Sequence, residues 1–198
     1  MTARTSHIML VLSAFLAGLV VFLAVFLYAT GQFQNGGPGG SAIGGPFKLT
    51  DQDGKTITEQ SFKGEPFLVF FGYTHCPDIC PTTLFELSEV LHAMGKDADR
   101  VHALFVSVDP ERDTPAVMKD YLSSFDPHLR GATGDRKAID AAEKAYHVYA
   151  KKVPTDNGDY SMDHTALVYL MDKQGRFVAP FNLKRRPEDA AADLKKFL

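Results

Sequence analysis

The longest apolar run of the chain lies near its beginning. Ile8–Ala29 contains no charged residue over about 22 positions, and a helix of that length is roughly 33 Å long, enough to cross a bilayer. A cleaved signal peptide usually has a shorter apolar region and ends in a small-x-small pattern, which Phe26–Gly31 lacks. The pattern therefore predicts one uncleaved transmembrane helix, which with its short N-terminal tail occupies residues 1–30.

A weak charge asymmetry sets the predicted orientation of this anchor. Arg4 is the only basic residue before the span, and the next one along the chain is Lys48. Because basic residues favour the cytoplasmic side, we expect a single-pass protein with its N-terminus inside and its remaining chain outside the cytoplasmic membrane. That side is the periplasm in a bacterium and the intermembrane space in a mitochondrion.

Residues 31–46 differ in composition from both neighbouring segments. They include seven glycines together with Gln, Asn, Ser and Pro, so they offer too little apolar surface to bury in a core. Such a chain is a flexible linker with an r.m.s. reach of roughly 20–24 Å. Residues 47–198 are long enough for a core of their own, and we expect them to form one domain held near the membrane.

Within residues 47–198, strand-like and helix-like patterns alternate. Pro66–Phe71 is a continuous apolar run, typical of a central strand covered on both faces. Thr83–Met94 has helical spacing and a Thr-x-x-Glu capping box, and Thr114 is the expected cap of a helix that starts at Pro115. Similar reasoning predicts a strand at 101–108, an extended segment at 148–153, a hairpin at 165–171 and 176–179, and helices at 115–125, 135–146 and 187–198. This order predicts an α/β fold, a thioredoxin-like central mixed sheet flanked by helices.

The charge of the predicted domain argues against nucleic acid as a partner. Because Arg4 is the only charged residue before position 48, the domain has 20 basic residues against 24 acidic ones, a net charge of −4. Nucleic-acid-binding domains normally carry a basic surface. Lys184–Arg186 is a small basic patch, which we interpret as solvated surface.

Cys76 and Cys80 are the two cysteines of the chain. In an exported protein a structural disulfide is the ordinary expectation. A bond between these two would close a loop with only three residues inside, and the stabilisation from loop closure falls as the loop shortens. We therefore interpret the pair as a reactive or metal-binding dithiol. It follows a predicted strand, where open α/β sheets place their ligands.

His164 is the candidate third ligand, far downstream and just before the predicted strand at 165–171. Two thiolates and one imidazole form a soft ligand set, which suits Cu(I) better than most biological metals. Three protein ligands leave one side of the ion open, so copper can pass to a partner by ligand exchange. Cu(II) is a second candidate, although thiolates can reduce it. Zinc tolerates the same ligands, so residue types alone leave the metal open.

Four segments resemble the Sco/SenC family of membrane-anchored copper chaperones. They are Gly72–Thr83 (Gly-Tyr-Thr-His-Cys-Pro-Asp-Ile-Cys-Pro-Thr-Thr), Phe105–Pro115 (Phe-Val-Ser-Val-Asp-Pro-Glu-Arg-Asp-Thr-Pro), Asp163–Thr165 and Tyr169–Phe177. Together they span nearly the whole predicted domain, and the anchor and linker fit the same plan. Thr165 stands where the family often has serine, which is a conservative departure.

This resemblance implies a thioredoxin-like domain that binds copper through Cys76, Cys80 and His164. It also implies delivery of the copper to the copper centre of a respiratory cytochrome oxidase. The expected partners are then a membrane-embedded cytochrome oxidase subunit, another periplasmic copper chaperone and a thiol reductant.

Two other functions compete with copper delivery. A thiol–disulfide oxidoreductase would use Cys76 and Cys80 as a redox-active catalytic dithiol on the cysteines of an oxidase subunit or another copper chaperone, and would not need His164. A peroxidase is the third candidate, because Val69–Phe71 leading to Cys80-Pro-Thr82 faintly resembles peroxiredoxins. That candidate lacks an evident arginine partner for its thiolate and leaves the histidine unexplained.

Residues beside the candidate ligands receive less specific interpretations. His75 is expected to be an exposed loop residue. Met162 offers a soft sulfur close to His164, but we expect it to pack in the interior. Asp109 ends a strand near the same edge and is a candidate to tune the site, but we expect it to form a turn with the proline that follows it. Asp163 is a candidate acceptor that orients the His164 ring, although adjacent residues often point apart.

Overall fold

The computed structural model describes residues 13–23, 25–26, 43–156 and 158–198. Residues 13–23 and 25–26 are helical, and Ser41–Leu198 forms a separate compact unit. Both ends of the predicted anchor, and most of the predicted linker, lie outside the described residues. Of the helices that are described, none is both long enough and apolar enough to span a bilayer. The predicted domain boundaries at residues 30 and 46 stay predictions.

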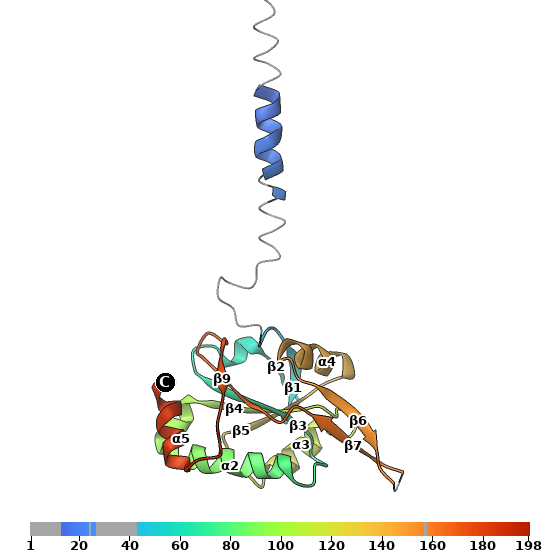
Figure 1. The fold of residues 1–198 in the computed structure, drawn as a ribbon, viewed down its shortest axis with the longest axis vertical. Helices are drawn as coiled ribbons and strands as arrows, with labels where there is room; N and C mark the ends of the chain where they lie inside the picture. Colours follow the sequence, from blue (N-terminus) through green and yellow to red (C-terminus); the bar gives the residue numbers. More distant parts are fainter. Residues whose placement is uncertain (1–12, 24, 27–42, 157) are drawn as a thin grey trace, which may run out of the picture. The chain divides into compact units, whose positions relative to one another are not determined.

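The described part of the compact unit contains a seven-stranded mixed sheet and a smaller two-stranded sheet (Figure 1). The large sheet has the order β2-β1-β5-β4-β3-β8-β9, in which β3, β4 and β5 are parallel and β8 runs antiparallel to β3. Its strands are β1 (Lys48–Asp51), β2 (Thr56–Thr58), β3 (Phe67–Gly72), β4 (His102–Ser107), β5 (Leu129–Thr133), β8 (Val168–Met171) and β9 (Phe177–Pro180). The second sheet is an antiparallel hairpin of β6 (Ala150–Pro154) and β7 (Tyr160–His164).

Helices cover both faces of the large sheet, and Figure 1 shows α2 and α4 on opposite sides of it. The helices are α2 (Ile79–Met94), α3 (Pro115–Leu122), α4 (Arg136–Ala145) and α5 (Pro187–Leu194). Short 3-10 segments occupy Glu59–Phe62, Gly95–Arg100 and Lys195–Phe197. The predicted mixed sheet flanked by helices is therefore confirmed.

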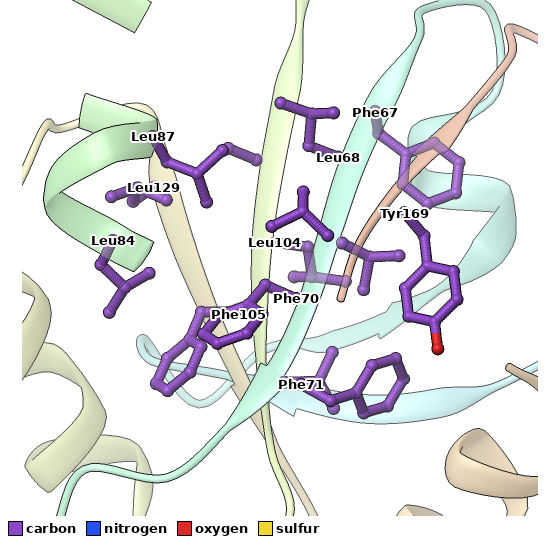
Figure 2. Close-up of a cluster of buried hydrophobic side chains, with 14 of the residues drawn as sticks. Phe67, Leu68, Phe70, Phe71, Leu84, Leu87, Leu104, Phe105, Leu129 and Tyr169 are labelled. Carbon is purple, nitrogen blue, oxygen red and sulfur yellow. The ribbon is translucent and has the colours of Figure 1, made fainter. Parts of the chain in front are cut away.

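Strand β3 is the centre of the core, and all of its residues are buried. Successive side chains of a strand point to opposite faces. Phe70 accordingly stacks on Phe105 with ring centroids 5.8 Å apart, while Phe71 meets the edge of Tyr169 at 6.4 Å. Figure 2 shows Phe71 with Tyr169 on one side of β3, and Phe105 with Leu84 on the other. Each buried phenylalanine contributes roughly 1.5–3 kcal/mol, so β3 is a rigid base for the loop that follows it.

Helix α2 begins four residues earlier than the sequence pattern predicts, at Ile79 instead of Thr83. The predicted capping box is therefore wrong, and the Thr83 hydroxyl donates to the Ile79 carbonyl at 2.7 Å. Pro81 is tolerated within this first turn, because the first N–H groups of a helix have no acceptor inside the helix. The earlier start places Cys80 in the first turn of α2. At the next helix the prediction is confirmed, since Thr114 accepts from the Val117 N–H and caps α3.

His128 joins the segment before β5 to the 3-10 segment Gly95–Arg100 by bridging two carboxylates. Its Nδ1 lies 2.6 Å from Asp126 Oδ1 and its Nε2 lies 3.0 Å from Asp99 Oδ1. The hydrogen bond with Asp99, and next the one with Asp126, raise the pKa of His128 above its ordinary value. The bridge therefore contributes stability fully below the unfolded-state pKa of about 6.5, and this contribution is lost as the pH rises through the higher folded-state pKa.

We expect His128→Gln to lower the free energy of unfolding more at about pH 5 than at about pH 9. The loss at the lower pH should be at most about 1 kcal/mol, because the bridge is partly exposed to water. Urea unfolding of both proteins at the two pH values measures the difference. An equal loss at both pH values would show that the charge of the ring is not involved.

Candidate metal centre

The two cysteines lie where β3 passes into α2. Gly72 ends the strand, Cys76 lies in the connecting loop, and Cys80 lies in the first turn of the helix. Both are free thiols, and only 9% of Cys76 and 0% of Cys80 is exposed. The backbone N–H of Cys80 donates to the Cys76 sulfur at 3.4 Å. The turn of the helix therefore brings the two sulfurs together beneath the surface.

His164 reaches the cysteines from the two-stranded sheet. It is the last residue of β7, and its Nε2 lies 3.6 Å from the Cys80 sulfur. The ligand atoms of Cys76, Cys80 and His164 all lie within 4.8 Å of one another. The expectation that these three residues meet in space is confirmed. The predicted strand at 165–171 is partly wrong, because β7 ends at His164 and β8 starts only at Val168.

A second hydrogen bond of the His164 ring fixes its tautomer. Nδ1 lies 3.2 Å from the Thr165 carbonyl oxygen, which can only accept, so Nδ1 carries the proton and donates it. The lone pair of the neutral ring is then on Nε2, the atom that faces Cys80. The carbonyl of Thr165 thus has the orienting role for which the sequence suggested Asp163, whose side chain is exposed.

Burial controls the protonation of this site. It raises the pKa of the Cys80 thiol well above its ordinary value, and the hydrogen bond with the Cys76 side chain and the charge of Asp113 act in the same direction, while a hydrogen bond from the Tyr73 backbone acts in the opposite direction. Burial also lowers the pKa of His164. Near neutral pH the site therefore holds a protonated Cys80 thiol and a neutral imidazole, and a cation that binds there displaces the thiol proton.

Two aromatic rings surround the imidazole. The Tyr73 ring meets His164 at a centroid distance of 5.8 Å and an angle of 89°, and Phe70 does so at 6.4 Å and 63°. Both aromatic residues are themselves buried. They restrict the ring to a narrow range of orientations, and they keep water from the inner side of the cluster.

Asp113 holds the cysteine loop in place, and the sequence reasoning missed it. Its fully buried carboxylate accepts from the Thr74 backbone N–H at 3.0 Å, the Thr74 hydroxyl at 2.6 Å and the Ser107 hydroxyl at 2.6 Å. Hydrogen bonds to a carboxylate are stronger than neutral ones, so this residue fastens the loop to the end of β4. Asp113 lies within the segment Phe105–Pro115 that carries the family resemblance, but of its acidic residues only Asp109 received an interpretation of its own.

The remaining site predictions are largely confirmed. His75 is exposed, with 51% of its side chain accessible, and it is not part of the cluster. Met162 is buried in the core, as expected. Asp109 does form the predicted turn, because its carbonyl accepts from the N–H groups of Arg112 and Asp113. Its carboxylate also accepts hydrogen bonds from Arg112 and Tyr160.

A family comparison agrees with this geometry. The model of the SCO1/SenC family matches residues 35–198. This chain belongs to the SCO1/SenC family. A relative from Rickettsia felis, described as an SCO2-like protein, is 37% identical over 155 residues, which is 77% of this chain and 76% of the relative. The chain spans about half, 52%, of the human mitochondrial SCO1 homologue.

Solved Sco structures share the fold. Bradyrhizobium japonicum ScoI, solved with copper bound, is 72% identical, with a TM-score of 0.77 over 79% of this chain and 99% of ScoI. BsSco, in which a disulfide switch was identified, is described as a member of the Sco family of cytochrome c oxidase assembly proteins. It is 25% identical, with a TM-score of 0.61 over 80% of this chain and 95% of BsSco. The domain therefore has the α/β thioredoxin-like fold of this family, and the predicted resemblance is confirmed.

Proposed function

We propose that this chain is a copper chaperone that binds copper through Cys76, Cys80 and His164. It then delivers the ion to the copper centre of a respiratory cytochrome oxidase. One observation carries the proposal: three soft ligand atoms lie within 4.8 Å of one another. The sequence around them is 72% identical to that of a Sco protein solved with copper bound. The membership of BsSco in a family of cytochrome c oxidase assembly proteins supports the oxidase as the destination.

The donor set favours Cu(I) over the other candidate metals. Two thiolates and a neutral imidazole match a soft monovalent ion, and they leave it with a low coordination number. Zinc usually takes a fourth ligand, and because the Tyr73 and Phe70 rings close the inner side of the cluster, that ligand would have to come from outside the protein. Cu(II) is accepted by the same three atoms, and the thiolates are then a source of reducing electrons.

The unequal burial of the two cysteines indicates how the ion leaves. Cys80 is fully buried, whereas Cys76 retains 9% exposure. An incoming ligand of a partner therefore reaches the ion from the side of Cys76, and copper passes by exchange of ligands without entering water. A membrane-embedded oxidase subunit is the acceptor in this proposal. A second copper chaperone and a thiol reductant supply the ion and the reduced cysteines.

The proposed location follows from the N-terminal sequence. The uncharged run Ile8–Ala29 is proposed as a single transmembrane helix, followed by the glycine-rich linker at 31–46. The domain at 47–198 then lies outside the cytoplasmic membrane, within reach of a partner embedded in the same bilayer.

Replacing His164 tests the three-ligand site. We expect His164→Ala to weaken Cu(I) binding by at least about tenfold, since the ligand itself should matter no less than the groups that orient ligands. The measurement is a competition titration of the reduced full-length chain in detergent against a Cu(I) chelator. His75→Ala is the matched control, because His75 is exposed and adjoins Cys76 but is not in the cluster. Equal affinities of the wild type and His164→Ala would remove His164 from the site.

A thiol–disulfide oxidoreductase remains the second candidate, and the free dithiol together with the disulfide switch of BsSco favours it. The same variants separate the two functions. Reduction of a disulfide substrate by the metal-free dithiol does not require His164, so it should survive His164→Ala while copper binding falls. The high pKa of Cys80 argues against this residue as the attacking thiolate.

A further inference from the structure

The hairpin of β6 and β7 supplies His164, yet it is a sheet of its own and projects beyond the large sheet (Figure 1). A two-stranded hairpin is only marginally stable by itself. Along β7 the side chains alternate, so that Tyr160, Met162 and His164 share one face. Contacts of that face with the rest of the domain therefore determine where the imidazole lies.

Arg112 makes the contact at the far end of this face. Its guanidinium carbon lies 3.8 Å from the centroid of the Tyr160 ring, and its Nη1 donates to the Tyr160 carbonyl at 3.0 Å. Its Nε donates to Asp109 Oδ2 at 2.5 Å, and the Tyr160 hydroxyl donates to Asp109 Oδ1 at 2.9 Å. The three side chains form a closed ring of contacts between the turn after β4 and the start of β7. We call these three residues the Arg112 clasp.

The clasp continues to the metal site through Tyr73. The ring of Tyr73 lies 5.8 Å from the Arg112 guanidinium and also 5.8 Å from the His164 ring. The backbone of Met162, midway between Tyr160 and His164 on β7, interacts with the Tyr73 hydroxyl. Fixing Tyr160 and Tyr73 therefore fixes the strand at two points before it reaches the imidazole.

We propose that Arg112 is a positioning residue of the metal site: by stacking on Tyr160 and joining it to Asp109, it holds the hairpin so that His164 Nε2 faces the Cys80 sulfur. This inference rests on the proposed function. Arginine suits the role because its planar, multidentate group stacks on a ring while it donates to two acceptors at once. The ammonium group of lysine keeps the positive charge, but it is not planar and cannot stack on the ring while donating to two acceptors in fixed directions.

Arg112→Lys is the central variant. It leaves a cation beside the buried Asp109 carboxylate, so the fold should be retained. It also removes Nη2, a buried nitrogen that has no hydrogen-bond partner among the described residues. We expect the Cu(I) affinity of the full-length chain to fall by about tenfold, as when other groups that orient metal ligands are lost. In the Cu(II) form, the nitrogen hyperfine coupling from the imidazole should become weaker or heterogeneous in electron paramagnetic resonance.

A double-mutant cycle distinguishes positioning from general destabilisation. If Arg112 acts through His164, then Arg112→Lys should cause no further loss of affinity when His164 is already alanine. Tyr160→Leu should reproduce the effect of Arg112→Lys, because it removes the other half of the stack. Arg136→Lys is the matched control: Arg136 also donates to a carbonyl after β4, that of Val108, but its carboxylate partners lie on α4.

The outcomes separate this inference from the proposed function. If His164→Ala weakens copper binding while Arg112→Lys has no effect, or has the same effect with and without His164, then the positioning role is wrong and the metal site stands. If the wild type itself binds no copper, or shows no nitrogen coupling, the proposed function fails and the inference fails with it. Equal losses in Arg112→Lys and Arg136→Lys would also overturn the positioning role.

Discussion

Cys80→Ser should abolish tight copper binding, with a loss of about a thousandfold or more, roughly 4 kcal/mol. A serine hydroxyl has nearly the shape of the thiol, but it is a hard, neutral donor that does not replace a thiolate on Cu(I). Cys80 is central to the cluster, because its sulfur lies 3.6 Å from His164 Nε2 and its own N–H donates to the Cys76 sulfur. The expected loss therefore exceeds that of His164→Ala.

The measurement is the same Cu(I) competition titration of the full-length chain, with a thermal melt of the metal-free protein as its control. The melt should shift little, because the hydroxyl fits the space of the thiol and can donate to His164 Nε2 in its place. Cys76→Ser should give a loss of the same order. Retention of near wild-type affinity in either serine variant would mean that copper binds elsewhere.

Gly72→Ala should both destabilise the domain and disturb the metal site. A Cβ atom at position 72 would lie 2.7 Å from a ring carbon of Phe105 and 2.8 Å from the Cys80 sulfur. Real Cβ atoms do not approach so closely, so the strand, the ring or the sulfur must shift. Overpacking of this kind costs about 1–3 kcal/mol. Because one of the two clashing atoms is the Cys80 sulfur, copper affinity should fall together with the free energy of unfolding.

Urea unfolding and copper titration of the same preparation measure the two effects of Gly72→Ala. Gly134→Ala is the matched control, since a Cβ there meets its nearest neighbours, Ala138 and Leu49, at 3.3 and 3.4 Å. We expect that variant to change both quantities much less. Wild-type copper affinity in Gly72→Ala would show that Cys80 does not need its observed position.

The sequence was sufficient for those parts of the fold that have strong local patterns. The apolar run of β3 and the capped start of α3 were both predicted from neighbouring residues. The meeting of Cys76 and Cys80 with His164 was expected from a strand starting at Thr165 beside the central strand and from the family resemblance. Strand β8 does pair with β3, but it starts at Val168, and His164 lies at the end of β7.

The elements and residues that the sequence did not predict have weak local patterns, and contacts with distant parts of the chain determine their structure. Strand β5 contains Gly131, a poor strand former, and a Cβ at this position would lie 2.7 Å from a Leu122 methyl carbon, so the Leu122 side chain would have to shift. In β7 the alternation of Tyr160, Met162 and His164 with polar residues was present, but it is too short to be separated from loop. Asp113 could not be assigned, because its partners lie on two other segments of the chain.

The hydrogen bond between Cys80 and His164 joins residues 84 positions apart. An unfolded chain holds no such cluster, so a bound ion is coupled by mass action to the whole unfolding equilibrium of the domain. At a free ion concentration one hundred times the dissociation constant, this linkage adds about 2.7 kcal/mol. The melting temperature of the chain should therefore rise with the fraction of molecules that hold copper. A molecule that has transferred its copper to a partner unfolds more readily than one that still binds it.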